Sequence, residues 1–213
     1  FGQQQDTLTT FVVGTYQETD IGASCYHNNL AILESILNHT DDRSGYVVVD
    51  MVAGIDSFAG TLHQQFDLTC LVVEPTRRGI AVYEQYRTLA QEAGLLGQLR
   101  VIVNKVRSVR DREFIQAHIA PDNILGYVTD DEHIRTIDQT GAAIDPTQLS
   151  SENQAVLEGI IAVTDSLPDL RDQRLKKLWD LHKKYVSQAF ITERFGDLTH
   201  QIDTQFSFRQ GTP

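Results

Sequence analysis

The sequence contains few of the residues that hold small secreted proteins together. Among 213 residues there are two cysteines, one methionine and one tryptophan, and two cysteines cannot build a disulfide scaffold. Neither a signal peptide nor an apolar run of transmembrane length is visible. These absences exclude a disulfide-rich secreted domain and indicate a cytoplasmic protein in a reducing compartment.

Basic residues are also scarce. The chain has 18 Lys and Arg against 29 Asp and Glu, which gives a formal charge of −11. A general nucleic-acid-binding surface needs clustered Lys and Arg, so we expect no such partner. Hydrophobic residues make up 41% of the chain, which is enough for the core of one globular domain with an appendage.

A phosphate-binding loop is missing as well. Nucleotide-binding proteins cradle phosphates in a Gly-rich loop that carries a lysine, and no such loop occurs between Phe1 and Pro213. The chain also begins at Phe1 rather than at a methionine. We therefore expect an upstream segment in the native gene product.

The segment over residues 47–54, VVVDMVAG, is the most informative part of the chain. Asp50 ends a predicted interior strand, where a carboxylate is costly unless it is paired or near a metal. In phosphate-transfer proteins this position holds Mg²⁺ through a water, and Gly54 would offer its backbone N–H to the γ-phosphate and permit movement on hydrolysis. The alternative is an ordinary Asp that caps the following turn, since short motifs also match by chance.

Apolar runs rich in β-branched residues alternate with amphipathic segments along most of the chain. Strands are predicted over 9–16, 46–50, 68–74, 99–106 and 124–129. Helices are predicted over 28–38, 78–93, 110–119, 153–166 and 169–190. Such alternation is typical of an α/β fold with a doubly wound, mostly parallel sheet, whose ligands bind outside the carboxyl ends of the strands. We assign residues 1–145 to this domain and 146–213 to a helical extension.

Two dipeptides at predicted strand ends are candidates for binding a nucleotide base. Asn104 follows the run Val101–Val103, and its amide can read a purine edge with one donor and one acceptor; Lys105 is the adjoining candidate. Glu74 and Pro75 end the preceding strand and could form a wall of a base pocket. The alternatives are a turn Asn and a simple strand terminator, because proline fixes the chain direction and removes a donor.

Cys25 and His27 are candidate metal ligands, because a thiolate and an imidazole two residues apart on a loop can reach one ion. Two ligands do not complete a site, but a symmetric dimer would supply two more at its two-fold axis. The alternative is a lone thiol and a loop histidine. Cys70 lies in the middle of a predicted strand, where we expect it to fill the core.

Five segments together resemble one known family. They are GASCYHNNL, VVVDMVAGIDSFAGT, LVVEPTRRGI, VIVNKVRSVRD and PDNILGYVTDDE, in the order and spacing of that family. The resemblance is to the CooC-type nickel-insertion ATPases of carbon monoxide dehydrogenase maturation, within the MinD/ParA-like deviant P-loop (SIMIBI) ATPases. It covers roughly residues 9–140.

The resemblance implies a role for each matching residue. It implies that Asp50 is the switch II aspartate near Mg²⁺ and that Gly54 senses the γ-phosphate. It also implies that Asn104 recognises the adenine of ATP or ADP and that Glu74 and Pro75 lie beside the base. The family acts as a homodimer that ATP closes and hydrolysis opens, and it serves a client metalloenzyme.

The metal site follows the family pattern only in part. Cys25 matches the first cysteine of a Cys-x-Cys pair that binds metal between two subunits, but the second position is His27. A mixed site for Ni²⁺ or Zn²⁺ at a dimer interface is the corresponding expectation. The resemblance also implies that the P-loop and the central strand beneath it precede Phe1, so that the sheet of this chain lacks its first strand.

Two other functions remain as alternatives. One is a partition or positioning ATPase that binds a membrane or DNA, for which the helix predicted over 169–190 offers basic residues and an apolar stripe; the acidic composition argues against it. The other is a degenerate, non-catalytic scaffold that acts through protein contacts.

Overall fold

The computed structural model describes residues 2–5, 7–12, 33, 34, 36, 37, 45–51, 55–58 and 60–202. The chain forms two compact units. One combines residues 1–66 with 170–213, and the other is the continuous stretch 67–169. Each unit is described by itself below.

The continuous unit is built on a parallel sheet of three strands. These strands are β3 (Thr69–Val73), β4 (Leu99–Val106) and β5 (Ile124–Thr129), in the order β3-β4-β5. All three coincide with predicted strands to within one residue at either end. Their runs of Val, Ile and Leu suit strands that are covered on both faces.

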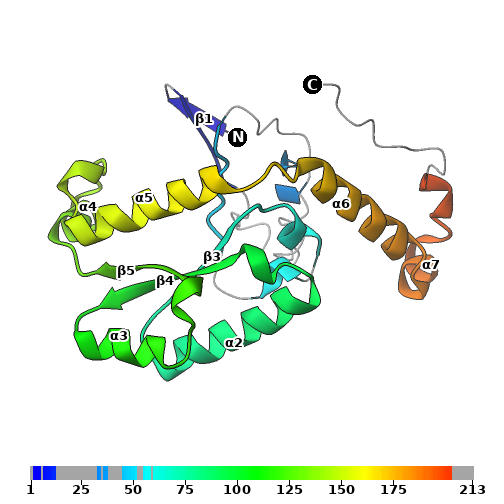
Figure 1. Ribbon diagram of the computed structural model, residues 1–213. Helices are drawn as coiled ribbons and strands as arrows, with labels where there is room; N and C mark the ends of the chain where they lie inside the picture. The colour runs from blue at the N-terminus through cyan, green and yellow to red at the C-terminus, as the bar shows by residue number, and fades with distance from the viewer. Residues whose placement is uncertain are drawn as a thin grey trace. The chain divides into compact units, whose positions relative to one another are not determined.

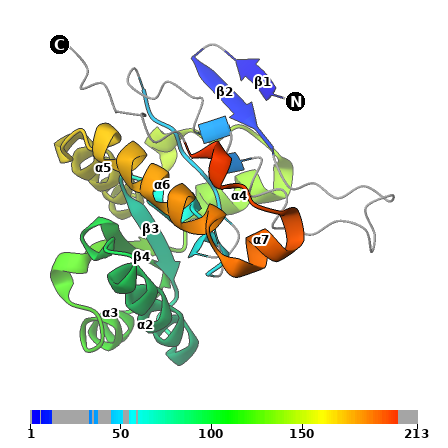
Figure 2. The same ribbon diagram turned by 90° about the vertical axis from the view of Figure 1, so that its right-hand side faces the viewer.

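Helices cover both faces of this sheet (Figures 1 and 2). One face carries α2 (Arg77–Glu92) and α3 (Val109–Gln116), and the opposite face carries α5 (Ser151–Ser166). The architecture is therefore the predicted α/β class with helices on both sides of a parallel sheet. The core on the α2 and α3 face consists of Val73, Ile80, Tyr83, Val101, Val103, Val106, Ile115 and Ile119.

Helix α5 lies close against β5. A Cβ atom added to Gly126 would come within 2.6 Å of Cγ2 of Val156, whose side chain is buried. The side chain of Asn153, at the start of α5, accepts a hydrogen bond from Thr129 N (3.0 Å) and donates one to Thr129 O (3.2 Å). The absence of a side chain at Gly126 thus permits the contact, and Asn153 fixes its position along the strand.

Local sequence signals set the ends of these helices. Gly94, predicted to follow α2, has a φ of +72°, which glycine adopts without a steric penalty. Ser108 and Asp111 form a reciprocal capping box at the start of α3. Helix α4 (Glu132–Thr140) was not predicted, although Asp131 caps its first turn and Gly141 ends it with a φ of +68°. Single 3₁₀ turns occur at Leu96–Gln98, Pro121–Asn123 and Pro146–Gln148.

The other unit draws on both ends of the chain. Its N-terminal part contains an antiparallel hairpin of β1 (Gly2–Gln5) and β2 (Leu8–Phe11), followed by 3₁₀ turns η2 (Asp56–Phe58) and η3 (Leu62–Gln64). Its C-terminal part contains α6 (Arg171–Val186), α7 (Ala189–Phe195) and the 3₁₀ turn η7 (Thr199–Gln201). Helix α6 packs against η3, where Leu62 is almost fully buried.

Three predictions for this unit differ from the structure. Residues 46–50 do not form a strand, and Val48 is 90% exposed. Of the strand expected over 9–16, residues 9–11 belong to β2, which pairs antiparallel with β1, and residues 13–16 lie outside the described residues. The helix expected over 169–190 is divided at Ser187 and Gln188 into α6 and α7.

Other predictions concern residues that the structure describes only in part, or a division that it does not test. Of the helix expected over 28–38, residues 33, 34, 36 and 37 are helical and the rest lies outside the described residues. The division into residues 1–145 and 146–213 stays a prediction. In the described part of the chain, no helix combines the length and apolar character needed to cross a membrane.

Candidate functional site

Four predicted site residues meet at the carboxyl ends of β3 and β4. Glu74 and Pro75 directly follow β3. Asn104 and Lys105 lie near the C-terminal end of the neighbouring strand β4. The Lys105 ammonium forms an ion pair with the Glu74 carboxylate, which joins the two strand ends. We call Glu74, Pro75, Asn104 and Lys105 the strand-end cluster.

A β-bulge shapes this cluster. Val103 pairs with Tyr127 and Val106 pairs with Thr129. Two residues of β4 therefore lie between these pairs, opposite one residue of β5. Lys105 has a φ of +59° and is the only non-glycine residue with positive φ in the described part of the chain. The extra residue keeps Val106 on the same buried face as Val101 and Val103 and leaves Lys105 exposed. Regular alternation would have turned Lys105 into the core.

The half-buried side chain of Asn104 is partly satisfied within the bulge. Its Oδ1 accepts a hydrogen bond from the backbone N–H of Lys105 at 2.9 Å. Among the described residues, no group accepts a hydrogen bond from its Nδ2. The amide can therefore donate to a ligand from Nδ2 and can also accept with the second lone pair of Oδ1.

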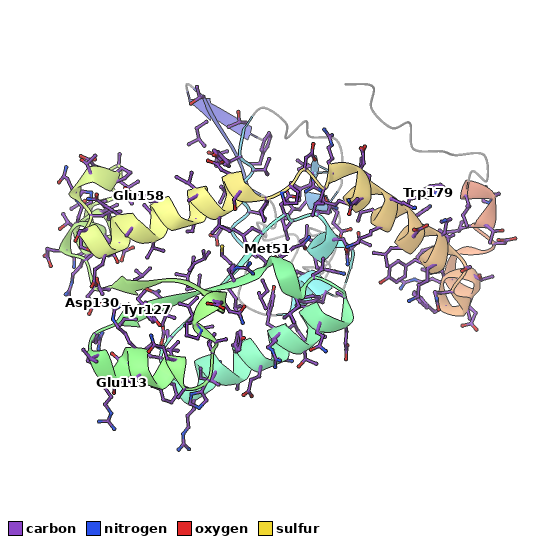
Figure 3. The ribbon with its side chains drawn as sticks, viewed as in Figure 1. Met51, Glu113, Tyr127, Asp130, Glu158 and Trp179 are labelled. Atoms are coloured by element: carbon purple, nitrogen blue, oxygen red, sulfur yellow. The ribbon has the colours of Figure 1, made fainter. Side chains whose placement is uncertain are left out.

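Further contacts organise the same edge. Arg107 Nε lies 3.2 Å from Asp130 Oδ2, so a second exposed ion pair links β4 to β5; Asp130 is at the end of β5 in Figure 3. Helix α2 begins here with Thr76, whose Oγ1 accepts from Gly79 N at 3.0 Å. A Cβ on Gly79 would lie 2.2 Å from the Glu74 carbonyl oxygen, so glycine is needed for α2 to start this close to the strand end.

Asp131 connects the end of β5 to α4 and α5. Its carboxylate accepts hydrogen bonds from Ser150 N (2.7 Å), Asn153 Nδ2 (3.0 Å) and His133 N (2.9 Å). These donors, with the Ser150 backbone N–H as the largest contribution, lower the pKa of Asp131 to about 2. The ionised carboxylate is therefore part of the folded structure around neutral pH.

Acid should weaken this junction. The pKa of Asp131 in the folded protein lies below its ordinary value of 3.8, so its stabilising effect is present above about pH 4 and is lost as the pH falls toward about 2. We expect Asp131→Asn to flatten the fall in unfolding free energy over this range, measured by urea denaturation at a series of pH values. The exposed Asp122→Asn variant serves as control, and an unchanged pH slope for Asp131→Asn would contradict the role assigned to Asp131.

The other predicted site residues lie outside the continuous unit that carries this cluster. Asp50 is exposed and belongs to the other compact unit, on a segment that is not a strand. Gly54, Cys25 and His27 lie outside the described residues. Within the ranges that the structure describes, no group of three or more His, Cys, Asp and Glu side chains could hold a metal ion.

Two half-buried titratable side chains lie elsewhere. Burial lowers the pKa of His63, against the opposing effects of the Ser57 carbonyl and the Glu34 carboxylate, and Phe58 stacks on its ring at 5.1 Å. Burial raises the pKa of Cys70 on β3. Both shifts favour the neutral forms, which suits packing roles.

Sequence reasoning missed part of the site. It treated Lys105 only as a neighbour of Asn104, although a lysine where alternation demands an apolar residue is a signal for a bulge. It also missed Asp131, whose position before an apolar-periodic segment ending at Gly141 is a helix-capping signal. No local signal indicates that Asn153 bonds to Thr129, because that contact joins residues far apart in the chain.

Comparison with known proteins places these observations in a wider context. No protein-family profile matches the chain. An uncharacterized ATP-binding protein of Methanocaldococcus jannaschii is 32% identical over 137 residues, which cover 62% of this chain and 52% of that protein. The carbon monoxide dehydrogenase accessory protein CooC of Rhodospirillum rubrum is 30% identical over 135 residues, which cover 63% of this chain and 50% of that protein. Over this stretch the chain is similar to both proteins.

The CooC-like similarity agrees with the resemblance found from the sequence segments. The chain spans about half the length of the curated relatives it matches. What those relatives bind or assemble therefore applies to this chain only as a proposal.

Proposed function

We propose that this chain is a CooC-like ATP-binding protein that hydrolyses ATP and acts as a dimeric switch in metallocentre assembly. The observation that carries the proposal is the strand-end cluster. Glu74, Pro75, Asn104 and Lys105 meet at the carboxyl edge of a parallel sheet, where ligands of such sheets bind. One relative is named as an ATP-binding protein and another as a carbon monoxide dehydrogenase accessory protein, and both names support the same class.

The residues of the cluster suit an adenine base. The Asn104 amide offers a donor at Nδ2 and an acceptor at Oδ1, which matches the ring nitrogen and the amino group that adenine presents side by side. Pro75 adds an apolar ring beside the end of β3. Glu74 and Lys105 neutralise each other, so the cluster does not repel a nucleotide by net charge.

Catalysis would need residues beyond the strand-end cluster. In this proposal Asp50, an exposed carboxylate, would help to hold Mg²⁺, and Gly54 would respond to loss of the γ-phosphate. When bound, Mg²⁺ would supply positive charge to offset the negative charge on the phosphate oxygens. The phosphate-cradling lysine would come from outside this chain.

The assembly function extends the proposal to metal and partner. Cys25 and His27 from two subunits would hold Ni²⁺ or Zn²⁺ at a dimer interface, and a client metalloenzyme would receive the ion. A cytoplasmic location belongs to the same proposal, because the low cysteine content suits a reducing compartment.

Nucleotide binding by the complete gene product tests the proposal. We expect isothermal titration to show ATP binding, and Asn104→Ala to weaken it about tenfold, as the loss of a base-reading hydrogen bond should. Gln173→Ala, an exposed change on α6, should leave the affinity unchanged. Absence of ATP binding by the unaltered gene product would remove the proposal and favour the non-catalytic scaffold.

A further inference from the structure

Lys105 occupies a backbone conformation that its side chain disfavours. Its φ of +59° is easily adopted by glycine but carries a steric cost for any residue with a Cβ. The core needs only the extra residue, because the register of Val103 and Val106 depends on the backbone and not on the lysine side chain. Core packing therefore does not explain why this position is a lysine, and its side chain must act elsewhere.

The side chain of Lys105 reaches across to the next strand. It pairs with Glu74, and the two side chains are 56% and 47% exposed. An ion pair this exposed adds little to global stability because water screens it. Its effect is local: it ties the backbone of the bulge to the end of β3.

The fixed peptide in turn orients Asn104. The N–H of Lys105 donates to Oδ1 of Asn104 at 2.9 Å. Rotating the amide by half a turn would place its NH₂ against that N–H donor, so the oxygen and nitrogen cannot exchange places without losing the bond. The cluster thus presents one donor and one acceptor in a set order. Adenine complements that order, whereas guanine offers two acceptors at the corresponding edge.

We propose that Lys105 is a positioning residue that makes the nucleotide site select adenine over guanine, by holding the Asn104 amide in one orientation through the strained bulge and the Glu74 ion pair. The inference rests on the proposed nucleotide site at the strand-end cluster. It adds a specificity device and names the residue that supplies it.

The variant Lys105→Gly separates this role from a structural one. Glycine relieves the backbone strain and removes the ion pair, so the midpoint of thermal unfolding of the nucleotide-free gene product should stay the same or rise. We expect ATP affinity, measured by titration calorimetry, to fall about three- to tenfold and the ratio of ATP to GTP affinity to fall with it. A lower unfolding midpoint, an unchanged ATP affinity or an unchanged ratio would each overturn the inference.

Two single variants and their combination test whether the ion pair acts through Lys105. Lys105→Met and Glu74→Gln each break the ion pair, and the double variant should weaken ATP binding no more than either single change if the two act as a pair. Lys177→Met, which removes an exposed lysine on α6, should leave both affinities unchanged. If the unaltered gene product binds no ATP, the proposed function itself fails; if it binds ATP but the Lys105 variants behave as it does, only the inference fails.

Discussion

Replacement of Asp50 by alanine should lower the rate of ATP hydrolysis by the complete gene product about a hundredfold or more. In the proposed mechanism this carboxylate orients the hydrated Mg²⁺ that neutralises charge on the transferring phosphate, and losses of that order follow removal of a group that stabilises developing charge. Steady-state phosphate release at saturating Mg²⁺ and ATP measures the effect. Because the Asp50 side chain is exposed, the fold should survive the change, as circular dichroism can verify.

The Asp50→Ala variant needs a control that removes the same charge elsewhere. Asp122→Ala removes an exposed carboxylate from the 3₁₀ turn before β5 and should leave the hydrolysis rate unchanged. If both variants retain the parental rate, Asp50 is the turn-capping residue that the sequence allowed as its alternative. A loss of ATP binding together with the rate would place Asp50 in ground-state binding rather than in catalysis.

Asn153→Ala should be the most damaging polar-to-alanine change in the continuous unit. Asn153 is 4% exposed, and its amide satisfies both the N–H and the C=O of Thr129 as well as one oxygen of Asp131. Removal of the amide leaves these partly buried groups unpaired, which should cost about 2–4 kcal/mol in unfolding free energy. Urea denaturation monitored by circular dichroism measures the loss.

Asn153→Asp sharpens the test because it keeps the size and one acceptor. Its second oxygen would face the Thr129 carbonyl and the Asp131 carboxylate, so we expect it to destabilise as strongly as alanine at neutral pH and less at acid pH. Glu158→Ala, on the same helix but exposed, should change the unfolding free energy by less than about 0.5 kcal/mol. Equal stabilities for the Asn153 and Glu158 variants would show that the junction of α5 and β5 tolerates the loss.

The sheet was predictable because its signals are local. Strands β3, β4 and β5 are short runs of Val, Ile and Leu that end at Val73, Val106 and Thr129, and each run carries its own boundary. That β3 and β4 are neighbours, which brings Glu74 to Lys105 at one edge, is known only from the structure. The sequence therefore predicted the elements that contribute to the strand-end cluster.

The rest depended on partners that local patterns do not specify. The run Val47–Val49 has the composition of a buried strand, yet composition does not provide the neighbouring strand that must satisfy its backbone. The prediction of a single helix over 169–190 did not include the helix end at Ser187, because an apolar stripe can continue across a break in the helical backbone. The positive φ of Lys105 likewise arises from pairing with β5 and not from the residue itself.

The division of the chain into two units has a consequence for its synthesis. Residues 67–169 form a unit of continuous sequence, whereas the other unit joins residues 1–66 to 170–213. On the ribosome, the sheet and its flanking helices can fold as soon as α5 has emerged, whereas η3 must wait for α6, its packing partner, to be made. Until α6 has been made, η3, which carries the buried Leu62, lacks this packing partner.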